Sequence, residues 1–152
     1  MARNQFLVAG LVFNDNGQIL LIKHKKKKVW LPPGGHVDEC ELPCVAVVRE
    51  VLEETGVSVQ VLSSISELGL IEGTARELPL PLRMIYWRID DTNYINLLYL
   101  CRAINTDTTP QETEVDDVGW YSPEDAVKMC THDDVIKTIK SVVEGHSKAL
   151  SL

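Results

Sequence analysis

Residues 30–57 read WLPPGGHVDECELPCVAVVREVLEETGV and join a proline–glycine turn to an acidic, helix-like pattern. Pro32–Gly35 interrupts any regular element, whereas Pro43 suits the first turn of a helix, where its missing N–H is not needed. Gly56 offers a C-terminal stop. The stretch therefore predicts a helix from about Leu42 to Thr55, directly behind a glycine turn.

Three glutamates of this helix, Glu50, Glu53 and Glu54, fall on one face at about 100° per residue. The rise from the first to the last is ~6 Å, so their carboxylates can converge on a hard cation such as Mg²⁺. The backbone carbonyls of Gly34 and Gly35 are further candidate oxygen ligands. A solvated acidic surface is the alternative interpretation of the same pattern.

The remaining helix positions predict a packing direction. Ala46 and Val47 share the acidic face, and Arg49 lies at its edge, four residues before Glu53, where an ion pair is available. The opposite side carries an apolar stripe, which we expect to pack onto a sheet. This stripe comprises Cys44, Val45, Val48, Val51 and Leu52.

The rest of the chain combines strand patterns in the middle with helical patterns at the end. The expected strands are Phe6–Phe13, Ile19–Ile22, Val57–Leu62, Ser64–Ile71, Leu80–Ile89, Tyr94–Ile104 and Val118–Tyr121. Glu72–Pro79 and Asn105–Asp117 read as loops, and Ser122 as the N-cap of a late helix. These patterns predict an α/β fold with helices covering a mixed sheet, in one domain over residues 1–152.

Composition limits the classes of function. The net charge of −7 argues against broad binding to nucleic acid or anionic membrane. No apolar run is long enough to span a bilayer, and the first ten residues lack the layout of a signal peptide. The four cysteines form no CxxC pair, which favours reduced thiols in a cytoplasmic protein. An anionic substrate would need a cation between itself and the acids.

The spacing of the opening stretch resembles the Nudix box. In order it reads Gly35, five residues, Glu41, seven residues, Arg49-Glu50-Val51, one residue, Glu53-Glu54, one residue, and Gly56-Val57. The likeness to the MutT-like Nudix hydrolases implies an α/β/α sandwich, with a mixed sheet between helices. It also implies Mg²⁺-dependent hydrolysis of a nucleoside diphosphate linked to another group, with Mn²⁺ as a substitute.

The resemblance also implies roles for single residues. Glu50 and Glu54 would be the main metal ligands, with Glu53 in the same cluster and the Gly34 carbonyl completing a shell. Arg49 would orient Glu53, and Glu41 would either support the junction between loop and helix or reach a metal through water. Gly35 and Gly56 would be conformational requirements. The general base is either Glu53 or a later loop acid such as Glu114, six residues before Trp120.

Substrate-binding candidates surround the box. Lys23, His24 and His36 are placed to approach phosphates, although His24–Lys28 also reads as a solvated hairpin tip. The candidate base-stacking residues, each of which could instead belong to the core, are Phe6, Tyr86, Trp87 and Tyr99.

The second motifs that mark ADP-ribose, dinucleotide, NADH and coenzyme A hydrolases of the family are absent. This favours a nucleoside triphosphate, undamaged or damaged, as a small-molecule substrate. Nucleotide sugars, dinucleotides and a non-catalytic nucleotide-sensing domain are the alternatives. Dimers are common in the family, so a homodimer is left open.

Overall fold

The computed structural model describes residues 2–62, 70–73 and 75–150, and within them eight strands form one mixed sheet. Strand β1 is central and pairs in parallel with β9, while the other pairings are antiparallel. The order is β10-β2-β1-β9-β5, with β3 on β2, β4 on β1 and β8 on β9. The strands are β1 (Arg3–Phe13), β2 (Ile19–His24), β3 (Trp30–Leu31), β4 (Gly34–His36), β5 (Val59–Leu62), β8 (Arg83–Ile89), β9 (Thr92–Ala103) and β10 (Val115–Tyr121).

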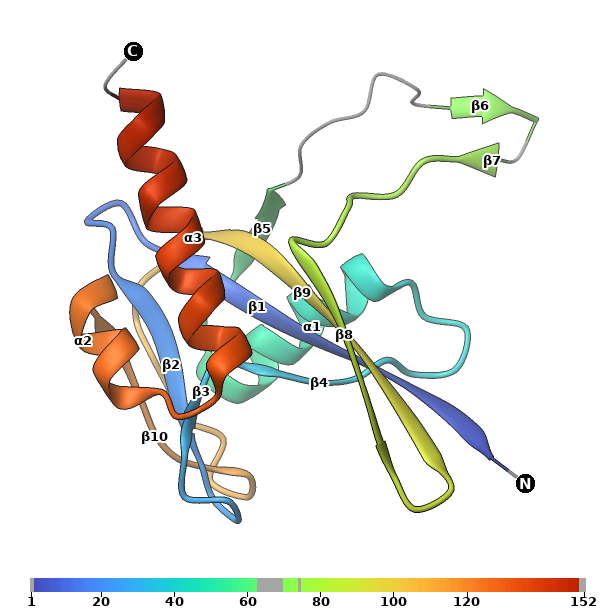
Figure 1. The fold of residues 1–152 in the computed structure, drawn as a ribbon, viewed down its shortest axis with the longest axis horizontal. Helices are drawn as coiled ribbons and strands as arrows, with labels where there is room; N and C mark the ends of the chain where they lie inside the picture. The colour runs from blue at the N-terminus through green and yellow to red at the C-terminus, as the bar shows by residue number, and fades with distance from the viewer. Residues whose placement is uncertain (1, 63–69, 74, 151–152) are drawn as a thin grey trace.

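Helices cover both faces of this sheet (Figure 1). Helix α1 (Pro43–Thr55) lies on one face, and α2 (Pro123–Met129) and α3 (Asp133–Leu150) lie on the other. Side chains along β1 alternate between the two faces of the sheet and so contribute to both cores. Val8 and Val12 pack toward α1, whereas Leu11 packs toward α2 and α3. The predicted α/β/α sandwich with a mixed sheet is confirmed.

The turn between β1 and β2 follows the predicted hairpin chemistry. The Asn14 side-chain oxygen accepts hydrogen bonds from the backbone N–H groups of Asn16 and Gln18, at 3.0 and 2.9 Å. Gly17 has a φ of 73°, which a residue without a Cβ adopts at little cost. The hairpin places β2 beside the central strand.

Helix α1 has the predicted length, but its buried face is only partly the predicted one. Gly56 ends it in the left-handed conformation, with its N–H donating to the Leu52 carbonyl. Val45 and Leu52, expected to pack on the sheet, are 52% and 47% exposed. The buried side instead carries Ala46, Val47, Val51, Glu54 and Thr55. The expected stripe was therefore right for Val51 and wrong for Val45 and Leu52, and Cys44 and Val48 pack against the core while partly buried. The buried face is rotated toward the acidic side because the small Ala46 and Val47 let that side approach the sheet.

Other differences lie in the second half of the chain. The stretch expected to be a loop at Glu72–Pro79 contributes to a small two-stranded sheet of β6 (Leu70–Glu72) and β7 (Ala75–Arg76), which projects from the body in Figure 1. The expected strand at Ser64–Ile71 lies outside the described residues, apart from its last two positions. Strand β10 starts at Val115 rather than Val118, because Val115 pairs with His24 of β2.

The predicted start of α2 is confirmed, since the Ser122 hydroxyl accepts from the Asp125 N–H at 3.1 Å. None of the helices in the described part of the chain combines the length and apolar character needed to cross a bilayer.

We expect Gly34→Ala to destabilise the fold by about 3 kcal/mol. An added Cβ would lie 2.1 Å from the Val8 carbonyl oxygen and 2.8 Å from the Ala9 Cα, so the central strand would have to move. Urea denaturation measures the effect. The matched control is Gly145→Ala in α3, where an added Cβ meets nothing within 4 Å. This substitution should raise the free energy of unfolding by about 0.5–1 kcal/mol, because alanine favours the helix more than glycine does. Equal stability of Gly34→Ala and wild type would contradict this account.

Candidate active site

The glycine turn lies in close contact with both β1 and α1. Gly34 and Gly35 of β4 pair with Ala9 and Val8 of the central strand. A Cβ on Gly35 would lie 2.5 Å from the carboxyl group of Glu50. Because glycine has no Cβ, the turn can contact this carboxylate directly, which is compatible with the conformational role expected of Gly35.

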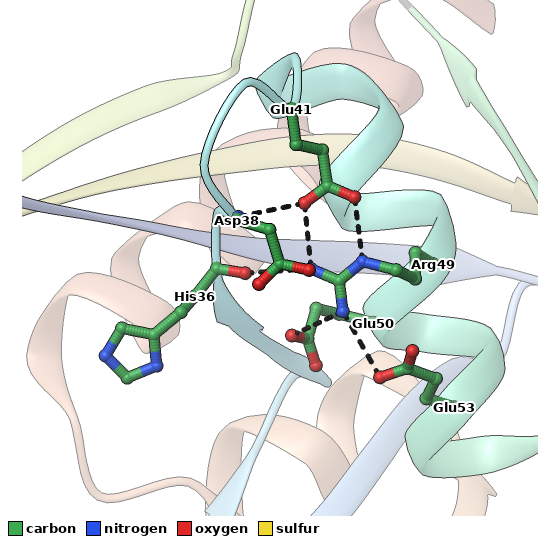
Figure 2. Close-up of polar contacts among 6 residues, drawn as sticks. All are labelled: His36, Asp38, Glu41, Arg49, Glu50 and Glu53. Carbon is green, nitrogen blue, oxygen red and sulfur yellow. Dashed lines mark hydrogen bonds and ion pairs between the residues drawn. The ribbon is translucent and has the colours of Figure 1, made fainter.

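Arg49 is the hub of an acidic cluster formed by the turn and the helix, as Figure 2 shows. Its Nε and Nη2 donate to the two carboxylate oxygens of Glu41, both at 2.8 Å. Its Nη1 donates to Glu50 at 3.0 Å and to Glu53 at 3.2 Å. Nη2 also donates to the His36 carbonyl. One guanidinium thus connects β4, the following loop and α1.

Contacts within this cluster shift the pKa values of Glu41 and Arg49. The hydrogen bonds that Arg49 donates to Glu41 lower the pKa of Glu41 to about 2, and the same bonds raise the pKa of Arg49. The predicted support of the loop–helix junction by Glu41 is therefore consistent with the geometry, because its carboxylate also accepts from the Asp38 N–H at 3.1 Å. The predicted pair of Arg49 with Glu53 is present.

Glu54 lies next to this cluster but without such a partner. It is only 4% exposed, and its Oε2 has no hydrogen-bond partner. Burial, followed by the charges of Glu50 and Glu114, raises the pKa of Glu54 to about 8, against a smaller opposing effect of the Gly34 N–H. Burial also raises the pKa of Glu50, although Arg49 opposes the shift. The site therefore holds more negative charge than its protein partners neutralise.

This donor set fits a divalent cation, which prefers carboxylate and carbonyl oxygens. Oε2 of Glu54 has no hydrogen-bond partner, and the neighbouring Glu50, paired with Arg49 through Oε1, offers further carboxylate oxygen. No three His, Cys, Asp or Glu side chains converge on one point in the part of the chain that the structure describes. Arg49 accounts for this, since it holds Glu50 and the half-exposed Glu53. A cation would have to draw these carboxylates toward Glu54.

A cavity of about 620 Å³, which we name the site cavity, opens beside Glu54. The glycine turn and the acids Glu54 and Glu114 line one part of it, and the β2–β3 loop lines another. Its floor is the sheet face beneath the start of α3. The lining residues on the loop and near α3 are His24, Lys26, Lys27, His132 and Asp134, and those of the floor include Leu7, Ala9, Ile85, Trp87, Asn96 and Leu98.

Backbone hydrogen bonds bring Glu114 to this cavity. The N–H of Gln111 donates to the Glu54 carbonyl at 3.1 Å, and that of Thr109 donates to the Thr55 carbonyl at 2.8 Å. The Lys25 N–H donates to the Glu114 carbonyl at 2.9 Å. The loop after β9 is thus attached both to the end of α1 and to β2, which places the Glu114 carboxylate near Glu54.

Two of the three candidate phosphate-binding residues line the site cavity, and the third does not. His24 and His36 line the site cavity, and Nε2 of His36 is hydrogen-bonded to the side-chain amide oxygen of Gln5, which accepts, at 2.9 Å. Lys23 pairs with Trp30 and Asp117 within the sheet and is not a lining residue. Burial and Lys27 lower the pKa of His24, so the positive charge near the cavity resides on the lysines.

The candidate stacking residues divide in the same way. Trp87 lines the site cavity and stacks on Tyr94, with ring centroids 5.5 Å apart and an interplanar angle of 11°. Tyr99 is 2% exposed and belongs to the core, the alternative that the sequence left open. Phe6 and Tyr86 are exposed outside the site cavity.

Sequence reasoning missed Asn96, His132 and Asp134 as lining residues. Asn96 had a local signal, since it is a polar residue inside an otherwise apolar strand pattern, Ile95–Leu98. His132 and Asp134 had none, because only the position of α3 over the sheet brings them to the cavity.

Comparisons with known proteins were consistent with this geometry. A model of the NUDIX domain family matches residues 3–142. The crystal structure of a NUDIX-family hydrolase from Clostridium perfringens superposes with a TM-score of 0.73 at 26% identity, covering 90% of this chain and 97% of that one.

Two curated relatives match shorter shares of their own length. The m7GpppN-mRNA hydrolase NUDT17 of Xenopus laevis is 32% identical over 137 residues, 84% of this chain and 44% of the relative. The 8-oxo-dGDP phosphatase NUDT18 of Danio rerio is 33% identical over 58 residues, 36% of this chain and 18% of the relative. The chain therefore spans less than half the length of either relative.

We expect Arg49→Gln to lower the free energy of unfolding at pH 7 by about 2 kcal/mol, because Glu41 and Glu50 lose their counter-ion. The folded-state pKa of Glu41 is depressed, so its contribution is present above pH 4.5 and lost as the pH falls through about 2. The difference from wild type should therefore shrink in acid. The control is Arg88→Gln, whose pair with Asp91 is exposed, with an expected change below about 0.5 kcal/mol. A difference that does not depend on pH would contradict the assigned role of Glu41.

We expect Glu54→Gln to stabilise the cation-free protein at pH 8. Because the folded-state pKa of Glu54 is raised, the free energy of unfolding of the wild type falls as the pH rises from 4.5 to about 8, by about 1.4 kcal/mol per pH unit at most. Denaturation in EDTA at several pH values should show this slope in the wild type and a shallower one in Glu54→Gln. Glu112→Gln, in an exposed part of the loop, should keep the wild-type slope. A divalent cation should stabilise the wild type and not Glu54→Gln.

Proposed function

Since this chain belongs to the Nudix family, whose model matches residues 3–142, we propose that it is a Mg²⁺-dependent pyrophosphohydrolase of nucleoside triphosphates, undamaged or damaged. The observation that carries the proposal is the buried Glu54 carboxylate, unpartnered at Oε2, at the edge of a cavity that also holds cationic and aromatic groups. A cation bound there would link an acidic protein to an anionic substrate.

The cavity provides a place for each part of such a substrate. Lys26 and Lys27 would hold the phosphate chain, and His24 would add a neutral hydrogen-bonding group. Trp87, which stacks on Tyr94, would contact the base. The relatives named above act, by their names, on a capped mRNA end and on an oxidised guanine nucleotide, which supports guanine nucleotides as the first to test.

The proposed chemistry follows from the positions of the acids. Glu50 and Glu54, with the Gly34 carbonyl, would hold Mg²⁺, and Glu53 would join them once released from Arg49. When bound, Mg²⁺ would neutralise the negative charge that builds on the phosphate oxygens and would lower the pKa of the attacking water. Glu114 would take the proton from that water, because it lines the cavity, whereas Glu53 is turned to Arg49.

The function is tested with a panel of substrates in the presence of Mg²⁺ or Mn²⁺. The panel holds normal and oxidised nucleoside triphosphates and diphosphates, capped RNA, nucleotide sugars, dinucleotides and coenzyme A. Mass spectrometry of products formed in oxygen-18 water identifies the bond that is broken. We expect turnover to be highest for a triphosphate. Tight binding of a nucleotide without any turnover would instead support a sensing domain.

We expect Glu114→Gln to lower kcat by about 10²–10⁴-fold, as for loss of a general base. Glu53→Gln should lower kcat less and weaken the activation by Mg²⁺. Glu112→Gln is the matched control, since it changes the same loop outside the site cavity and should retain wild-type turnover. A larger loss of kcat in Glu53→Gln than in Glu114→Gln would reverse the two assignments.

A further inference from the structure

Asn96 is a polar residue in the floor of the site cavity, far along the chain from the acidic helix. It lies on β9 in register with Leu7 of β1 and Ile85 of β8, so the three side chains form one row across the sheet. All three line the cavity, as do Leu98 and Trp87 on neighbouring rows. The neighbours of Asn96 on the sheet, Leu7 and Ile85, are therefore apolar, and the ring of Trp87 lies on a neighbouring row.

The Asn96 amide is also incompletely hydrogen-bonded. Among the buried side-chain oxygen and nitrogen atoms of the described residues, those without a hydrogen-bond partner are Glu54 Oε2 and Asn96 Oδ1. Both residues line the same cavity. Buried polar groups without a partner are rare in folded proteins, and proteins that depart from this rule do so chiefly at functional sites. Two such atoms at one cavity indicate two places where a ligand supplies the missing partner.

The two places differ in chemistry. The carboxylate oxygen of Glu54 can be satisfied by a cation, whereas the neutral amide oxygen of Asn96 can be satisfied by an N–H donor. An apolar floor beside Trp87 suits a flat ring, and the edge of a nucleobase is such a ring with N–H donors next to acceptors. A phosphate would not satisfy Asn96, because phosphate oxygens are acceptors and the missing partner is a donor.

On the basis of the proposed function, we infer that the Asn96 amide recognises the nucleobase of the substrate. Its Oδ1, turned toward the cavity by rotation about χ2, accepts from an N–H of the base, and its Nδ2 donates to the adjacent acceptor. Guanine offers such a pair at N1–H and O6, and adenine offers one at its amino group and N1. The unsubstituted purine ring, without an N–H on that edge, offers none.

The test compares kcat/KM for guanosine, adenosine and purine-riboside triphosphates. We expect the wild type to favour the better of the first two over purine riboside by about 10- to 100-fold, a discrimination typical of a paired hydrogen bond to a base. Asn96→Leu should reduce this ratio to within about threefold. Asn96→Val, which suits a strand, provides a second variant should leucine not fit. An unchanged ratio in the folded variants would overturn the inference.

The Tm of the ligand-free protein distinguishes a role of Asn96 in base recognition from a role in packing of the fold. Removing an unpaired buried amide should leave the Tm of the ligand-free protein unchanged or raise it, whereas loss of a structural contact would lower it. The matched control is Asn93→Leu on the same strand. Its side chain bonds Asn4 and Tyr86 on the opposite face, so the base ratio should remain that of wild type.

Failure of this inference can be distinguished from failure of the proposed function. The rise in Tm on adding guanosine or adenosine monophosphate reports base binding without hydrolysis. If the wild type hydrolyses no nucleotide but shows this rise, and Asn96→Leu loses it, the inference stands and the enzymatic proposal fails. If the wild type hydrolyses triphosphates with the same base ratio as Asn96→Leu, the enzymatic proposal stands and the inference fails.

Discussion

The burial of Glu54 among other acids is the constraint on which the site depends. Its carboxylate is 4% exposed, close enough to Glu50 and Glu114 for their charges to raise its pKa, and Oε2 has no partner. Such an arrangement costs free energy in the absence of a cation, because an ionised group is removed from water beside like charges. The glycine turn makes the arrangement possible, since a Cβ on Gly35 would collide with Glu50.

Arg49 compensates part of this charge and determines which acids stay available. It binds Glu41 through two hydrogen bonds and Glu50 and Glu53 through one each, while Glu54 lies beyond its contacts. The arginine therefore stabilises the junction of loop and helix and leaves Oε2 of the innermost carboxylate, Glu54, without a partner. On one helix face, Glu50 and Glu53 are thus paired with Arg49, whereas Glu54 has no positively charged partner among the described residues.

Much of the fold was predictable because its local signals agree. Asn14 and Gly17 specify the first hairpin, Gly56 ends α1, and Ser122 starts α2. The orientation of α1 was predicted only in part, because a hydrophobicity pattern places Val51 correctly but assigns Val45 and Leu52 to the core and Glu54 to water. Tertiary structure reverses this assignment, since Ala46 and Val47 allow the acidic side to approach the sheet.

The sequence by itself determined which residues form the acidic cluster around Arg49, to which we assign the chemistry. Gly35, Glu41, Arg49, Glu50, Glu53 and Glu54 lie within one short segment, and helix periodicity is enough to bring their side chains to one face. Only the tertiary structure decided what surrounds them. Glu114 reaches Glu54 through a loop attached to α1 and β2, and Asn96 enters the cavity through its register with β1 and β8. Such contacts depend on strand pairing between distant segments, which local propensity and spacing do not encode.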